Sequence, residues 1–161
     1  MCAEQSVVQE TLDACTVENV SEMQRSLDEI YRSHSQGFRH DYQASLQLLD
    51  VDMSGLPCGP KAAFATKGYF AGQYQRRGRQ LGRVLATYSE EVVVDRLFVG
   101  NVQLIKALQP LVEAAETTLA LDAAKRARTM IRVDAGAGTL DDNFAGISRA
   151  SCPRALSLRL R

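Results

Sequence analysis

Two short apolar runs in this chain each end in aspartate, and this pattern restricts the fold more than any other feature. The first run begins at Leu46 and carries Asp50 and Asp52 near its end, and in the second Asp134 directly follows Val133. Short apolar runs bounded by glycine or proline are typical of buried strands. A carboxylate at a strand end is a common ligand for divalent metal ions, because the backbone holds it where water and substrate can reach it. The sequence therefore predicts an α/β fold with a metal site on its sheet.

Length and hydropathy set the class of protein. The chain has 161 residues, which is enough for one hydrophobic core. It contains no run of about 18 apolar residues, the length needed to cross a membrane. Its first five residues lack the basic and apolar regions of a signal peptide. We therefore expect a cytoplasmic protein with no membrane partner.

A net charge of zero conceals a strong segregation of charge along the chain. Before Lys61 the only lysines or arginines are Arg25, Arg32 and Arg39, whereas residues 61–89 contain no acid at all. A basic cluster of this kind can neutralise phosphates and release their condensed counterions. The alternative is a solvated basic loop that binds nothing. We predict the following residues to bind DNA: Lys67, Arg76, Arg77, Arg79 and Arg83.

The order of the expected elements follows from periodicity and turn residues. Two helices are predicted over residues 5–31, with a break near residues 14–16, where Thr16 and Asn19 offer capping chemistry. A strand is expected over residues 45–53, ended by Gly55 and Pro57. Two antiparallel strands, 80–87 and 91–98, follow with a turn at 88–90. A helix over 102–123, interrupted at Pro110, and a strand over 130–134 complete the pattern.

An ordered series of short motifs resembles the DDE transposases of bacterial insertion sequences. The series covers residues 47–143, and its order is more specific than any single piece. Its pieces are LLDVDMSGLP (residues 48–57), TKGYF (66–70), GRQLGR (78–83), LFVGN (97–101) and IRVDAGAGT (131–139).

The resemblance implies an incomplete ribonuclease H-like mixed sheet with flanking helices, preceded by a short helical segment. It implies catalytic and metal-binding roles for Asp52 and Asp134, with Asp50 as an alternative first ligand because residues i and i+2 share a strand face. Two magnesium or manganese ions would then activate the attacking hydroxyl and stabilise the leaving oxygen during DNA strand cleavage and transfer. The implied partner is DNA, and a homodimer is left open.

One member of the family pattern is missing from this sequence. The implied third acid is a glutamate on a helix well downstream of the second aspartate, but Glu116 is the last glutamate in the chain. We therefore expect an inactive fragment that binds metal weakly or not at all. Its expected parts are a helical remnant of a DNA-binding region (1–42), a partial catalytic domain (43–143) and an atypical tail that is disordered or frameshifted (144–161).

Two other functions stay open at this point. Asp50 and Asp52 with Ser54 also match the Asp-x-Asp-x-Thr/Ser signature of haloacid dehalogenase-like, magnesium-dependent phosphatases. In that interpretation Asp50 would be the nucleophile and Asp52 the acid/base. It leaves the motifs of residues 66–70, 78–83 and 97–101 unexplained. The third interpretation is a non-catalytic DNA-binding remnant.

Overall fold

The computed structural model describes residues 4–59, 61–70, 72–133 and 157–160. The chain divides into two compact units: a helical unit, Met1–Ser35, and a sheet unit, Gln36–Arg161. The sequence placed this boundary at residue 42. Of the site residues predicted above, Asp134 lies outside the described residues, and so does the greater part of the expected tail.

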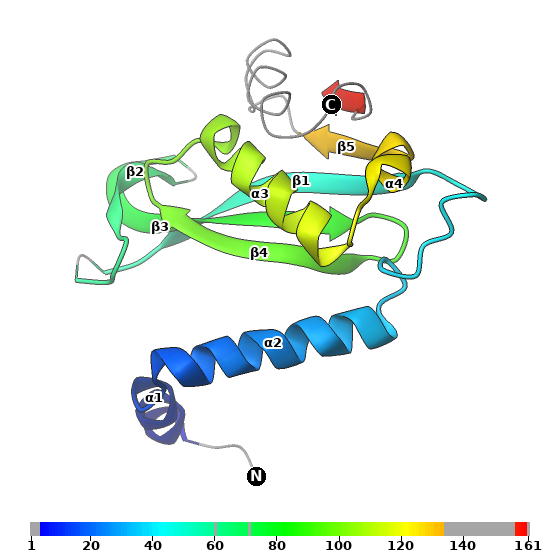
Figure 1. Cartoon of the computed structure of the whole chain (residues 1–161). Coiled ribbons are helices and arrows are strands. Elements are labelled where there is room, and N and C mark those ends of the chain that lie inside the picture. Colours follow the sequence, from blue (N-terminus) through cyan, green and yellow to red (C-terminus); the bar gives the residue numbers. More distant parts are fainter. Residues whose placement is uncertain (1–3, 60, 71, 134–156, 161) are drawn as a thin grey trace. The chain divides into compact units, whose positions relative to one another are not determined.

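The helical unit contains the two helices that the sequence predicts. Helix α1 spans Gln5–Asp13 and α2 spans Val17–His34 (Figure 1). A complete capping box begins α2: the Thr16 side chain accepts from the Asn19 backbone N–H, and the Asn19 side chain accepts from that of Thr16. These bonds satisfy N–H groups that a helix start leaves unpaired. The expected break at residues 14–16 is therefore confirmed, with Thr16 as the cap.

The sheet unit is a mixed α/β structure, as predicted. Strand β1 (Gln47–Pro57) pairs antiparallel with β3 (Gln73–Ala86) and parallel with β5 (Thr129–Val133). Strand β4 (Glu91–Val99) continues the antiparallel pairing from β3, and β6 (Ser157–Leu160) lies parallel beside β5. The strand β2 (Thr66–Phe70) pairs with the first part of β3. The strand order is therefore β2-β3-β1-β5-β6, with β4 on the same edge of β3 as β2.

Several strands are longer than the sequence predicts. Strand β1 continues past Met53 to Pro57, because Gly55 and Leu56 pair with Gln80 and Arg79 of β3. Proline is tolerated there because it stands at the end of the strand. The basic segment before residue 80, where the sequence predicted no strand, forms a hairpin of β2 with the start of β3. Strand β6 lies in the tail, where the sequence predicted no regular structure.

One face of the sheet is covered by helix α3, Leu104–Thr118 (Figure 1). Leu108 and Leu111 of α3 are buried together with Val51, Val84 and other strand residues that face the helix. The helix continues through Pro110, where the sequence predicted an interruption. It ends at Thr118, five residues before the predicted end at 123. Ala120 then turns the chain with a φ of 49°, and the short helix α4 (Ala123–Ala127) begins under an Asp122 cap.

None of the helices that the structure describes combines the length and the apolar character required to span a bilayer.

Candidate functional site

Strand β1 places Asp50 and Asp52 on the sheet face that points away from α3. Leu49 and Val51 are each 2% exposed and face the helix, whereas Asp50 is half-buried and Asp52 is exposed. Alternation along a strand puts residues 50 and 52 on the same side. We call this side the aspartate face and the opposite side the helix face. The Asp52 carboxylate accepts a hydrogen bond of 2.7 Å from the backbone N–H of Met53.

Asp50 is held by one side chain from β5 and by one that directly follows β3. The guanidinium of Arg132, its register partner on β5, donates through Nε and Nη2 to both oxygens of Asp50. The hydroxyl of Thr87 donates to Oδ2 of Asp50 over 3.0 Å. The hydrogen bond to Asp50, with the attraction of its charge, raises the pKa of Arg132. Asp50 therefore ties β1 to β5 and to the end of β3, a role that the sequence did not indicate.

The register between β1 and β5 bears on Asp134. Val51 pairs with Val133, the last described residue of β5. In the sequence Asp52 follows Val51, and Asp134 follows Val133. Among the described residues alone, which exclude Asp134, no group of three or more His, Cys, Asp or Glu side chains is placed to hold a metal ion.

The predicted DNA-binding residues divide between the two faces of the sheet. Asp52 pairs with Arg83 across β1 and β3, so Arg83 lies on the aspartate face, and alternation places Arg77 and Arg79 there too. Lys67 pairs with Arg77 and shares this face. Arg76 is on the helix face, opposite Gly68. The structure therefore brings four of the five predicted cations to the face that carries Asp50 and Asp52.

On the aspartate face, Arg83, Arg79 and Arg77 each have a partner within the fold. Arg83 forms a bidentate ion pair with Asp95 of β4, with both N–O distances at 2.7 Å. The hydrogen bonds to Asp95, with the attraction of its charge, raise the pKa of Arg83. Arg79 donates to the carbonyl of Ala63 over 2.7 Å, and Arg77 to that of Ala65 over 3.2 Å. Arg77 and Arg79 therefore anchor the loop that precedes β2.

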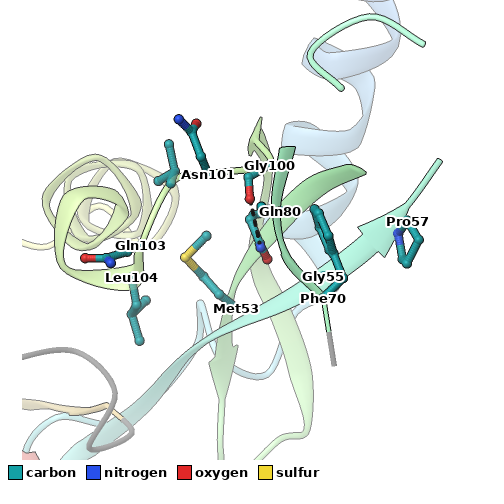
Figure 2. A pocket seen from close by; sticks show the side chains of 11 residues that line it. Met53, Gly55, Pro57, Phe70, Gln80, Gly100, Asn101, Gln103 and Leu104 are labelled. Carbon is teal, nitrogen blue, oxygen red and sulfur yellow. Dashed lines mark hydrogen bonds between the residues drawn. The ribbon is translucent and has the colours of Figure 1, made fainter. Parts of the chain in front are cut away.

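The helix face carries a cavity of about 700 Å³ that the sequence did not predict. It lies between β1, the end of β4 and the start of α3, with Met53 and Leu104 toward the helix and Phe70 and Pro57 on the other side (Figure 2). Gln80 donates to the Gly100 carbonyl at its wall over 3.2 Å. Among the described residues, those that line it include no charged side chain. Glycines at 55, 68 and 100, present in the quoted motifs, are the only sequence signal for it.

We compared the chain with protein-family models, curated proteins and solved structures, and none of them matches it.

Proposed function

We propose that the sheet unit is an incomplete ribonuclease H-like domain that binds divalent metal and DNA, as in a DDE transposase. The strand arrangement supports the fold: an antiparallel set β1, β3 and β4 is followed by α3 and then by β5 parallel to β1. The ribonuclease H-like fold has this order, with one metal-binding aspartate on its first strand and one on its fourth. The hairpin strand β2 is an addition to that plan.

The pairing of Val51 with Val133 carries the proposed metal site. An aspartate follows each of these two residues in the sequence, so Asp52 and Asp134 succeed a directly paired couple on parallel strands. Carboxylate oxygens are the ligands that magnesium and manganese prefer. In this proposal Asp52 and Asp134 bind one ion, weakly, since two carboxylates neutralise its charge but fill few of its coordination positions.

Asp52 suits a metal better than Asp50 does. The oxygens of Asp50 already accept hydrogen bonds from Arg132 and Thr87. A cation at Asp50 would have to displace the arginine or lie beside its positive charge. Asp52 is exposed, and its carboxylate accepts a hydrogen bond from the backbone N–H of its neighbour Met53. We therefore assign a structural role to Asp50, which the sequence left as an alternative metal ligand.

DNA cleavage by this chain alone is not part of the proposal. Glu116, the last glutamate in the sequence, is buried and paired with Arg126 over 2.8 Å. It lies on α3, which covers the helix face, whereas Asp52 is on the aspartate face. A missing acid removes part of the charge stabilisation that the two-metal reaction needs. We therefore infer binding of metal and DNA without strand transfer.

The contacts of Asp50 do not favour the phosphatase alternative. Its nucleophile would be Asp50, which needs a carboxylate oxygen that can reach a phosphorus atom. The guanidinium of Arg132 instead engages both oxygens and stabilises the charge that the attack would consume. The arrangement around Asp50 is that of an ion pair between strands.

Manganese titration tests the metal site. We expect Asp52→Asn and Asp134→Asn each to weaken Mn²⁺ binding at least about tenfold. The relaxation rate of water protons measures this binding. The double substitution Asp50→Asn with Arg132→Met removes a neutral pair and should leave the affinity within about threefold. Asp28→Asn on α2 is the charge-matched control. Unchanged affinity in Asp52→Asn would overturn the assignment.

A nicking assay tests the absence of cleavage separately. The whole chain is incubated with a supercoiled plasmid and Mg²⁺ or Mn²⁺. We expect no nicked product above the level of the Asp52→Asn variant. Nicking that depends on Asp52 would show that the chain completes an active site.

A further inference from the structure

The helical unit exposes an apolar stripe that is independent of the proposed metal and DNA site. In this unit, no apolar side chain that the structure describes is buried. Val20, Met23, Leu27 and Ile30 of α2 are between 49% and 60% exposed. In proteins, most of the stability of a helix comes from packing of its apolar side rather than from intrinsic helix propensity. The stripe therefore needs a partner surface.

The spacing of the stripe is that of a coiled coil. Its residues are separated by three, four and three positions, which is the a and d pattern of a heptad repeat. At 3.6 residues per turn, these four side chains form one narrow row along α2. The row covers two heptads, so the contact it supports is short and its affinity modest.

The charges of α2 indicate which partner fits. The residues that flank the stripe are uncharged: Asn19, Gln24, Ser26 and Tyr31. All charged residues from Glu18 to Arg32 lie on the opposite side of the helix, with Arg25 directly opposite the stripe. Two copies can therefore bring their stripes together without placing like charges across the contact.

Nucleic acid and membrane surfaces fit this helix poorly. Acids on the polar side of α2, Glu18, Glu22, Asp28 and Glu29, outnumber its two arginines. That excess repels phosphate and anionic lipid headgroups, which favour a polar side rich in Lys and Arg. A contact between identical helices meets no such repulsion.

We propose that α2 mediates homodimerisation by pairing antiparallel with α2 of a second copy. In this arrangement Val20 faces Ile30 of the other copy and Met23 faces Leu27, so the stripe is complementary to itself about a twofold axis that crosses the seam at the level of residue 25. Antiparallel packing also sets the helix dipoles in opposite directions. The dimer is predicted for the whole chain, whatever the outcome of the metal and DNA tests.

Sedimentation of the whole chain measures the dimer. We expect a concentration-dependent shift from monomer to dimer, and at least a tenfold weaker association in Leu27→Glu, which places a charge in the seam. Arg25→Gln is the matched control, because it changes the charge by the same amount on the opposite side, and it should associate like the parent. Both positions are exposed, and circular dichroism checks that the helices persist. A chain that stays monomeric up to about 500 µM would overturn the proposal.

Cysteine crosslinking tests the antiparallel arrangement. In a background with Cys2, Cys15, Cys58 and Cys152 changed to serine, Ser26→Cys lies near the twofold axis and should crosslink to its own copy under mild oxidation. Ser33→Cys, one heptad away, faces residue 19 of the other copy and should not. Ser21→Cys, away from the stripe, should not crosslink either. Equal crosslinking at 26 and 33 would contradict the antiparallel pairing, since only a parallel pair treats these positions alike.

Discussion

The two faces of the sheet are stabilised in different ways. On the helix face, Val51, Val84 and Ile131 are buried and are at most 2% exposed. On the aspartate face, cross-strand ion pairs lie among apolar side chains that remain exposed, such as Leu97 at 48%. Burial of apolar area is the dominant favourable contribution to folding, whereas partly exposed ion pairs contribute little. The helix face therefore stabilises the fold, and the aspartate face is available for binding.

The largest expected difference in the free energy of unfolding is between truncating a leucine that packs against the helix face and truncating one on the aspartate face. Leu111 of α3 is fully buried against the helix face. Leu111→Ala should lower the free energy of unfolding of the sheet unit by about 3 kcal/mol, because it leaves a cavity. Leu97→Ala on the aspartate face should cost less than about 1 kcal/mol. Urea denaturation measures both, and comparable losses would contradict the assignment of the core to the helix face.

The next largest expected loss of stability comes from disturbing the close backbone packing at Gly100, beside the cavity on the helix face. A methyl group at Gly100 would place its carbon 2.3 Å from the Gly78 carbonyl oxygen and 2.7 Å from that of Thr66. Both atoms belong to the backbone and cannot rotate aside. We expect Gly100→Ala to cost about 2 kcal/mol. Apart from Gly59 and its chain neighbours, no atom of the described residues lies within 4 Å of such a carbon at Gly59, so Gly59→Ala is the control and should be neutral or slightly stabilising. Equal stability of the two variants in urea would show that the strands do not meet so closely.

The apolar runs and turns of the sequence were sufficient to predict much of this architecture. Strands β1, β4 and β5 and the turn before β4 lie close to their predicted positions. The capping box at Thr16 followed from residue types alone. These features depend on neighbours in the sequence, and local preferences are what a single sequence records.

The features that were missed depend on partners far apart in the chain. The sequence predicted no strand at Lys67 and Arg77, but they pair in a hairpin whose glycines allow close packing. Asp50 and Arg132 are 82 positions apart, and Arg83 and Asp95 are on different strands. No local pattern reveals such pairs. The sequence could therefore nominate the aspartates and the basic cluster but could not tell which charges the fold neutralises.

The smallest expected effect is a change in the salt dependence of DNA binding, compared between two cations of the aspartate face. Lys67 is exposed, whereas Arg83 is neutralised by the bidentate pair with Asp95. If the face binds DNA, Lys67→Gln should lower the slope of log affinity against log salt by about one. Arg83→Gln should change that slope less, because its charge already has a carboxylate partner. Fluorescence anisotropy with a short duplex, at salt concentrations from about 50 to 200 mM, measures both slopes.

The double substitution Arg83→Gln with Asp95→Asn provides the control for this comparison. It removes the ion pair without changing the net charge, so its slope should match that of the parent chain. A larger change for Arg83→Gln than for Lys67→Gln would mean that DNA displaces Asp95 from Arg83. The aspartate face would then include Arg83 as a phosphate contact, and the ion pair with Asp95 would be a feature of the DNA-free protein.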